Sequence, residues 1–292
     1  MKRLIAIAAT LAALTTACAE SGAQPLGPAP GDGSPSPTAS PSVSPTSNPT
    51  PSPTPVPKST YEVWFHYDGA LFVSHRTRPV TTFLESWALD DVLAGPTAKE
   101  RATGLGTAIA PGTEWSDFVI KDGIATVSFR SGFTAEETPA VAAESLAEIV
   151  YTLTQFDSVR GVAIEVKGTR LTNLWGYELR GPLRRADFAD QLPFILVESP
   201  GIGERVSSPV TIAGTSDVFE AVVSIEILDE NGDTLASTFT MATCGTGCRG
   251  SYSTDVGYGV ETRQPGTIRV YEVSAMDGSP IHIVETPVML TP

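Results

Sequence analysis

The sequence predicts an α+β protein in which two folded domains follow a leader and a spacer. Three observations carry this prediction. An apolar run near the N-terminus ends at a cysteine, a long Pro/Ser/Thr-rich segment comes next, and helical periodicity stops after Leu192 while strand-like segments continue. The expected boundaries are a lipoprotein signal peptide over 1–17, a disordered linker over 18–59, an α/β domain over 60–170, a connector over 171–192 and an immunoglobulin-like domain over 193–292.

The leader predicts where the protein works. Residues 4–17 are apolar after a basic start, and the run is shorter than the roughly 20 residues that a transmembrane helix needs. We expect cleavage before Cys18 and a diacylglycerol on its sulfur, which would anchor the protein to the extracytoplasmic face of the cell membrane. Leu14 stands four residues before Cys18 instead of the usual three. The alternative is a soluble secreted protein that is cut nearby.

The spacer has too few apolar residues to bury a core, so we expect it to be disordered and to favour polyproline II. A tether of about 40 residues, each extending about 3.1 Å, would reach roughly 120 Å from the membrane.

Strand-like and helix-like segments alternate in the α/β domain. A strand is expected over 61–68, and a helix over 81–95 that Gly95 and Pro96 would end. Two strands over 117–129 flank the hairpin signal Asp122-Gly123. The apolar spacing predicts a helix over 138–156, and a closing strand follows over 159–168. The order is β-α-β-β-α-β, an α/β sandwich.

Short strands separated by turn residues fill the last part of the chain. About seven strands in about 100 residues are typical of an immunoglobulin-like β-sandwich. Asn231-Gly232 marks a hairpin within it.

The three cysteines and the acidic charge suit an exported protein. If Cys18 is lipidated, Cys244 and Cys248 remain as a pair in a CGTGC stretch, for which we expect a disulfide. A metal half-site or a redox pair are the alternatives, although a redox motif has two intervening residues instead of three. The net charge of −14 argues against a nucleic-acid partner.

The sequence predicts no catalytic residue, metal site or cofactor, and therefore a protein that is not an enzyme. The histidines, His66, His75 and His282, lack metal-ligand spacing, so structural roles are expected. Gly245-x-Gly247-x-x-Gly250 matches the dinucleotide pattern but lies between two strands and opens no helix.

The carboxylates have structural interpretations as well. Asp229-x-Asn231-x-Asp233 is expected to form a hairpin turn, because the glutamate that would complete a calcium loop is missing. The remaining candidates are expected on solvated helix faces: Glu85, Asp90, Asp91, Glu144 and Glu148.

Several segments resemble known families. The stretches ALDDVLAGPTAKE (88–100), GLGTAIAPGTE (104–114), DGIATVSF (122–129) and IVYTLTQFDSVRGVAIEVKG (149–168) resemble the GerMN domain of sporulation and spore-germination lipoproteins. The stretch SPGIGERVSSPVTIAGTSDVFEA (199–221), with ILDENGDTLA after it, resembles the immunoglobulin-like domain that often follows GerMN in bacterial envelope proteins. The resemblance implies no catalytic residues, and it relates the first domain to ring-building modules of envelope assemblies.

The leading hypothesis is therefore a non-catalytic envelope lipoprotein that binds an unidentified envelope protein. The alternative is a lipoprotein that binds cell-wall glycan or a small solute, for which Trp64, Trp87, Trp115 and Trp175 are the candidate aromatics. An envelope hydrolase would be a third possibility, but no acid/base constellation supports it. The motif residues Gly95, Pro96, Thr97, Tyr151, Thr152 and Gln155 are expected to maintain the fold more than to contact a partner.

Overall fold

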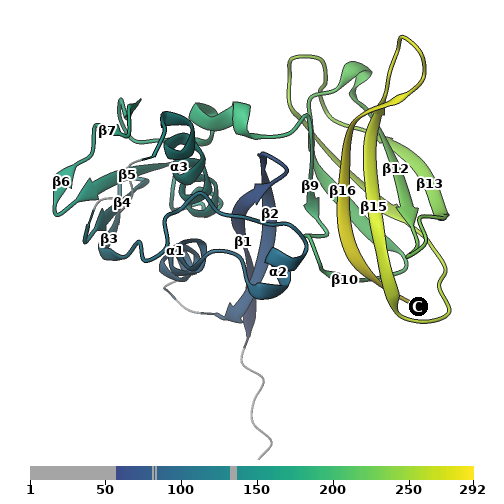
Figure 1. The fold of residues 1–292 in the computed structure, drawn as a ribbon, viewed down its shortest axis with the longest axis horizontal. Coiled ribbons are helices and arrows are strands. Elements are labelled where there is room, and N and C mark those ends of the chain that lie inside the picture. The colour runs from purple at the N-terminus through teal and green to yellow at the C-terminus, as the bar shows by residue number, and fades with distance from the viewer. Residues whose placement is uncertain (1–56, 81, 83, 132–136) are drawn as a thin grey trace, which may run out of the picture. The chain divides into compact units, whose positions relative to one another are not determined.

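A computed structural model describes residues 57–80, 82, 84–131 and 137–292. Cys18, the predicted signal peptide and nearly all of the predicted spacer lie outside the described residues. Residues 54–292 form one compact unit, which is mostly β with few helices (Figure 1). In this described part of the chain, no helix has the length and apolar character needed to cross a bilayer.

The first domain opens with an antiparallel hairpin of β1 (Lys58–Tyr67) and β2 (Ala70–Pro79). Asp68 and Gly69 form its two-residue turn, with φ of 48° and 77°, as a hairpin with two left-handed central residues requires. The strand β1 was predicted from the sequence, but β2 was not. The second half of β2, Ser74 to Pro79, is polar, so the strand lacks a continuous apolar pattern. The dipeptide Asp68-Gly69 could have indicated it, because the same dipeptide at Asp122-Gly123 predicted the next hairpin.

Three helices follow: α1 (Leu84–Ala94) and α3 (Pro139–Leu153) near their expected places, and the short α2 (Ala98–Ala102) between them. Gly95 follows α1 with φ of 73°, which suits a helix C-terminus. Thr97 and Thr138 cap α2 and α3 through their side-chain oxygens, and Pro139 occupies the first turn of α3. The short helix α2 was not predicted, because five residues carry no periodicity.

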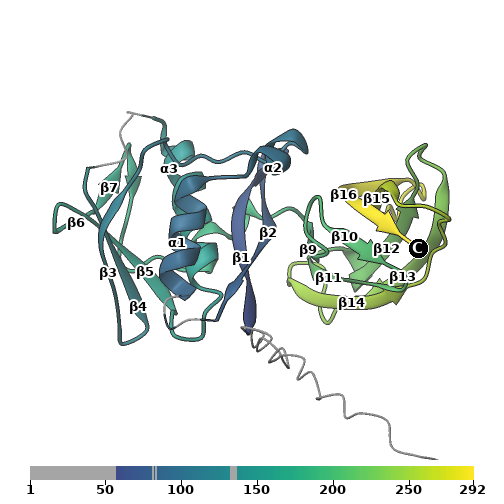
Figure 2. The same cartoon turned by 90° about the horizontal axis from the view of Figure 1, so that it is seen from below.

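A second sheet has the order β3-β4-β5-β6, with β3 (Trp115–Lys121), β4 (Ile124–Phe129), β5 (Gly161–Val166) and β6 (Thr169–Arg170). The predicted hairpin at Asp122-Gly123 is confirmed. β4 and β5 are parallel, and α3 forms the crossover between them. Figure 2 shows α1 and α3 between this sheet and the β1–β2 hairpin.

The observed order of β-β-α-α-β-β-α-β-β therefore differs from the predicted β-α-β-β-α-β, and the strands form two separate layers. The physical reason lies at the free edge of β1, where other groups replace a neighbouring strand. Gln155 accepts a hydrogen bond from Glu62 N at 2.6 Å and donates one to Glu62 O at 2.7 Å. Thr152 Oγ1 accepts from Trp64 N at 3.0 Å.

Two residues further along the same edge, the backbones of His66 and Gly106 exchange hydrogen bonds of 3.0 and 2.8 Å. Alternate residues of β1 thus have their outward backbone groups hydrogen-bonded by the C-terminal end of α3, by Gln155 after it and by the loop at Gly106. These bonds leave the edge unavailable for pairing with another strand.

The predicted connector folds into small elements. β7 (Asn173–Leu174) and β8 (Tyr177–Glu178) form a short hairpin, and the 3₁₀ segment η1 (Arg185–Gln191) follows. The rings of Tyr177 and Phe188 stack with centroids 5.9 Å apart. This stretch belongs to the core, since Phe188 is buried.

The last domain consists of two sheets that enclose an apolar core (Figure 2). The larger has the order β10-β16-β15-β12-β13 and the smaller β14-β11-β9. The strands are β9 (Ile195–Ser199), β10 (Arg205–Ser207), β11 (Val210–Ser216), β12 (Val222–Leu228), β13 (Thr234–Met241), β14 (Gly250–Val256), β15 (Gln264–Val273) and β16 (Pro280–Thr291), with the 3₁₀ turn η2 (Phe219–Ala221) before β12. Asn231 and Gly232 lie in the hairpin turn between β12 and β13, as predicted.

Candidate functional site

The cysteine pair of the last domain lies in the loop between β13 and β14. The Sγ atoms of Cys244 and Cys248 are 2.00 Å apart, at disulfide distance; the covalent bond stays a prediction, as does lipidation of Cys18. The nearby glycines explain the formal dinucleotide pattern. A Cβ at Gly250 would lie 2.2 Å from Cys244 N, and one at Gly245 would lie 2.5 Å from Val218 O. These glycines allow close backbone packing, and a strand follows them instead of a helix.

Each histidine pairs with a glutamate. The Nδ1 atoms of His66, His75 and His282 lie 2.7, 2.5 and 2.8 Å from carboxylate oxygens of Glu148, Glu204 and Glu272. Among the described residues, no group of three or more His, Cys, Asp or Glu side chains could hold a metal. Two of these pairs join segments that are distant in the sequence, whereas His282 and Glu272 lie on the neighbouring strands β16 and β15.

Glu148 corrects the expectation of a solvated helix face. Its side chain is fully buried and accepts hydrogen bonds from His66 Nδ1 at 2.7 Å, Thr107 Oγ1 at 2.6 Å and Ala108 N at 2.8 Å. Burial raises the pKa of Glu148, and these hydrogen bonds oppose the rise without cancelling it. No sequence pattern indicates this site, because the donors come from two other segments.

Asp91 is a second correction. Its carboxylate is only 12% exposed and pairs with Arg78, with Nη2 and Oδ1 2.5 Å apart. It also accepts a hydrogen bond from the hydroxyl of Tyr61. Burial and this contact with Asp91 raise the pKa of Tyr61 to about 12. Its neighbour Asp90 is exposed, as expected, and accepts a hydrogen bond from Trp115 Nε1 at 2.7 Å.

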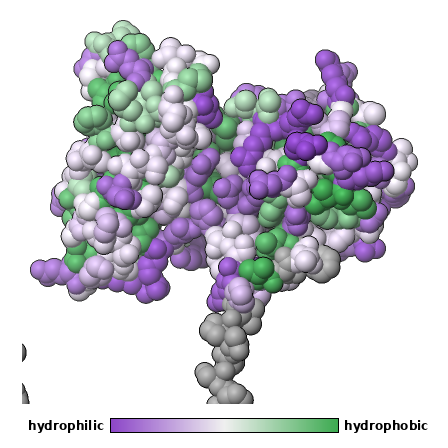
Figure 3. All heavy atoms as spheres, turned by 180° about the vertical axis from the view of Figure 1, so that it is seen from behind, coloured by the Kyte–Doolittle hydropathy of each residue, from purple (hydrophilic) through white to green (hydrophobic). Residues whose placement is uncertain are grey.

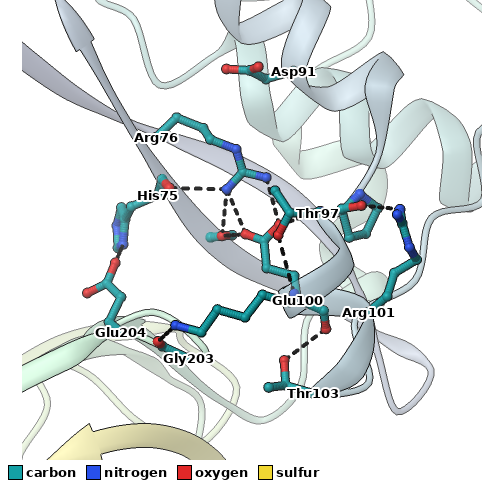
Figure 4. A network of polar contacts seen from close by, with 12 residues as sticks. His75, Arg76, Asp91, Thr97, Glu100, Arg101, Thr103, Gly203 and Glu204 are labelled. Atoms are coloured by element: carbon teal, nitrogen blue, oxygen red, sulfur yellow. Dashed lines mark hydrogen bonds and ion pairs between the residues drawn. The ribbon is translucent and has the colours of Figure 1, made fainter.

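A buried ion pair fixes α2 against β2 (Figure 4). Arg76 donates to Glu100 through two nitrogens, at 2.6 and 2.8 Å, the bidentate geometry that guanidinium and carboxylate prefer. Ser74 Oγ also donates to Glu100, and Thr97 N donates at 2.7 Å. Burial alone would raise the pKa of Glu100, but these donors outweigh it and lower the pKa to about 2. Thr97 is thus a structural residue.

Within the described residues, two hydrogen bonds connect the first domain to the last. His75 on β2 bonds Glu204, and Lys99 Nζ donates to Gly203 O at 2.8 Å (Figure 4). Burial lowers the pKa of His75, but the hydrogen bond and charge of Glu204 and the charge of Glu62 reverse this, so the pKa is raised overall. The hydrogen bond from His75 lowers the pKa of Glu204.

The remaining predicted candidates have structural surroundings. Asp229 Oδ1 accepts hydrogen bonds from Asn231 N at 2.8 Å and Asp233 N at 2.9 Å, so this motif is the expected hairpin turn. Trp64 is fully buried, and its ring lies 4.9 Å from that of Tyr151. Trp87, Trp115 and Trp175 are half-buried and pack against the core.

An exposed apolar surface was missed by the sequence analysis. On β13, Phe239 is 67% and Met241 64% exposed. The register pairs Met241 with Val222, and Phe239 with Ser224, which in turn pairs with Tyr271. Val273 follows Tyr271 by two residues, so it lies on the same face of the sheet, and it is 46% exposed.

We call these side chains, Val222, Phe239, Met241, Tyr271 and Val273, the outer apolar face. Apolar areas are visible between polar ones on this domain, at the left of Figure 3. A row of three charged residues, Glu226, Arg269 and Glu285, borders the outer apolar face. Arg269 lies 3.4 Å from Glu226 and 2.9 Å from Glu285. β13 is the last strand of its sheet, so one edge of this surface has free backbone groups within the described structure.

Two protein-family models match the chain. Residues 66–172 match the family described as "Sporulation and spore germination", and residues 194–279 match the "Immunoglobulin-like domain of bacterial spore germination". No curated protein matches.

Three solved structures are similar in part. The first GerMN domain of the sporulation protein GerM from Bacillus subtilis is 24% identical, with a TM-score of 0.37, over 44% of this chain and 99% of that one. The tandem GerMN domains of the same protein are 15% identical, with a TM-score of 0.40, over 80% of this chain and 61% of that one. A putative lipoprotein from Clostridium perfringens is 18% identical, with a TM-score of 0.34, over 49% and 98%.

These TM-scores are low, so the assignment rests on the two sequence models, whose matched ranges agree with the segments that resemble GerMN and immunoglobulin-like domains. The chain therefore combines a region that matches the sporulation and spore germination family, over residues 66–172, with a region that matches the immunoglobulin-like domain of bacterial spore germination, over residues 194–279.

Proposed function

We propose that this chain is a non-catalytic, lipid-anchored protein of the cell envelope that binds a partner protein through its immunoglobulin-like domain. The observation that carries the proposal is the outer apolar face. Phe239 and Met241 expose about two thirds of their surface, 67% and 64%, side by side on one strand. Exposed apolar patches of this kind mark protein interaction sites.

The surroundings of the outer apolar face support the same function. Protein interfaces commonly have an apolar centre and a polar rim, and the row of Glu226, Arg269 and Glu285 supplies such a rim. The free edge of β13 offers backbone donors and acceptors beside the apolar side chains, which suits a partner that adds a strand. Fold alone would not support this assignment; the exposed side chains do.

The membrane location rests on the leader and the spacer. A lipid on Cys18 would tether the described domains, and the roughly 40 residues of spacer would let them reach a partner up to roughly 120 Å away. Such a protein would act by holding its partner near the membrane, without chemistry of its own.

Site-specific photocrosslinking in intact cells tests the interaction. A photoreactive amino acid at Phe239 should give a light-dependent adduct with an envelope protein. The matched control is Thr238, which is exposed on the opposite face of the same strand. Equal adducts from both positions, or none from Phe239 when the protein is at its native level, would contradict the proposal.

Replacing the anchor residue tests the location separately. The Cys18→Ala variant should appear in the medium or remain unprocessed, whereas the unchanged chain should fractionate with membranes. Membrane retention of processed Cys18→Ala would rule out the lipid anchor while leaving the outer apolar face untested, so the two parts of the proposal can fail independently.

A further inference from the structure

A cavity of about 490 Å³ lies away from the outer apolar face. Its walls come from α3, η1, β9, β11 and the loop before β14. It contains two guanidinium groups, Arg185 and Arg249, and two carboxylates, Glu198 and Asp217, and Leu192 and Leu196 supply an apolar wall. Cavities of this size with few polar groups and an apolar wall are typical of small-ligand sites.

Arg185 is held in a fixed orientation. Its Nε donates to Thr154 Oγ1 and its Nη2 to Tyr151 O, both at 3.0 Å. The guanidinium carbon lies 4.8 Å from the ring centroid of Tyr151 and 5.4 Å from that of Trp64. Its Nη2 also lies 3.8 Å from a carboxylate oxygen of Glu62. Because these contacts use Nε and Nη2, they leave Nη1 available to a ligand. A cation fixed in this way binds an anion without first losing side-chain entropy.

Arg249 is also anchored by backbone oxygens. Its Nη2 donates to Pro193 O at 2.5 Å, and its Nη1 donates to Thr215 O at 3.3 Å. Burial lowers the pKa of Arg249, yet an arginine remains protonated in proteins. The cavity therefore holds a desolvated positive charge whose bonds are mostly to neutral carbonyl groups.

Glu198 is the group in the cavity that lacks a partner. It is half-buried, and no hydrogen bond or ion pair joins its carboxylate to any described residue. Burial raises the pKa of Glu198, the charge of Glu62 raises it further, and the charges of Arg185, Arg249 and His75 lower it. Asp217 differs, because its Oδ1 accepts a hydrogen bond from Gly247 N at 2.6 Å.

We propose that this cavity binds a small ligand that carries a carboxylate close to a hydrogen-bond donor. Arg185 and Arg249 would hold the carboxylate, and Glu198 would accept a hydrogen bond from the donor. Guanidinium groups suit planar carboxylates, and a half-buried carboxylate without a partner becomes more stable when a ligand supplies one. Two kinds of ligand share this chemistry: an ammonium-bearing amino acid or short peptide, and a hydroxyl-bearing sugar acid.

Calorimetric titration of the folded protein with three probes tests the proposal. Alanyl-alanine carries the ammonium group, glucuronate carries hydroxyl groups, and glucose is the matched control for glucuronate because it lacks the carboxylate. We expect the dipeptide or glucuronate to bind and glucose not to bind. Binding of the dipeptide alone would identify an ammonium ligand, and binding of glucuronate alone would identify a sugar acid.

Variants assign the binding to this cavity. Glu198→Gln keeps the side-chain shape, and we expect it to weaken binding about tenfold or more, as loss of a charged hydrogen bond does. Arg185→Lys should do the same by removing the planar fork. Glu261→Gln, an exposed carboxylate that does not line the cavity, is the control and should leave binding unchanged.

The proposal is overturned if neither alanyl-alanine nor glucuronate binds at millimolar concentration, or if glucose binds as well as glucuronate. It is also overturned if Glu198→Gln and Arg185→Lys have the melting curve of the parent protein and bind the probes as tightly as the parent does. These results leave the proposed protein interaction unaffected, because no residue of the outer apolar face lines the cavity.

Discussion

Glu144 and Glu148 show how differently two identical residues on one helix can behave. They stand one turn apart on α3, yet Glu148 is fully buried and Glu144 is partly exposed. The difference comes from what faces them. His66 and Thr107 approach Glu148 from 82 and 41 residues away in the sequence. Helical spacing alone cannot indicate such partners.

Replacing Glu148 should be costly for stability. We expect Glu148→Ala to lower the free energy of unfolding by about 3 kcal/mol, because three hydrogen bonds to a buried carboxylate are lost together. Glu144→Ala should change it by less than about 0.5 kcal/mol, as is usual for a surface substitution. Urea denaturation followed by tryptophan fluorescence measures both, and equal losses would contradict this account of Glu148.

At the scale of single elements, α3 does more than pack its apolar face. Thr152 in its last turn and Gln155 just after its end bond the backbone of β1, so this end of the helix takes the place that a neighbouring strand would occupy. Both residues were expected to maintain the fold, and their partner is a strand edge.

Hydrogen exchange can measure this closure of the β1 edge. In Gln155→Ala, the amide of Glu62 loses its acceptor, so its exchange should accelerate, and the free energy of unfolding should fall by about 1–2 kcal/mol. The amide of Trp64 is the internal control, since Thr152 still accepts from it. Unchanged protection at Glu62 would show that the edge does not depend on Gln155.

The loop between β13 and β14 allows a test of the cysteine pair. The sequence predicts a disulfide between Cys244 and Cys248, so the intact mass of the purified chain should rise by about two hydrogens on reduction, the difference between a disulfide and two thiols. A Cys244→Ser variant should show no such rise. An unchanged mass in the parent chain would mean that both cysteines are free.

For the whole molecule, the contacts of His75 with Glu204 and of Lys99 with Gly203 join the two domains. The paired groups of the first contact both titrate. The pKa of His75 is raised above 6.5, so its stabilising contribution is complete below 6.5 and is lost as the pH rises through the folded value. The pKa of Glu204 is lowered from 4.5, so its contribution is complete above 4.5 and is lost as the pH falls through the folded value.

The pair should therefore stabilise the protein most between pH 4.5 and 6.5. We expect the difference in unfolding midpoint between the parent and His75→Gln to be largest in this window and to shrink in alkaline solution. Other charges near His75 are those of Glu62 and Arg76. Lys99→Met is the control, because it removes the hydrogen bond to Gly203 O. Its effect on the unfolding midpoint should stay constant between pH 4.5 and 6.5. A pH-independent effect of His75→Gln would contradict this role of the pair.

The sequence by itself determined the turns, the longer helices and the division into two domains. Asp122-Gly123 and Asn231-Gly232 encode their hairpins locally, since few residues adopt positive φ easily, and Thr138-Pro139 marks the start of α3. The family resemblance rests on the same contiguous stretches.

Only the tertiary structure decided which polar groups are buried and which apolar groups are not. Glu148 is buried because distant segments supply its donors, and β1 stays apart from the second sheet because α3 closes its edge. Phe239 and Met241 are exposed because their face of the sheet is turned to solvent, whereas their apolar side chains alone would predict burial. Local spacing reports the shape of a segment, whereas burial depends on what the rest of the chain places against it.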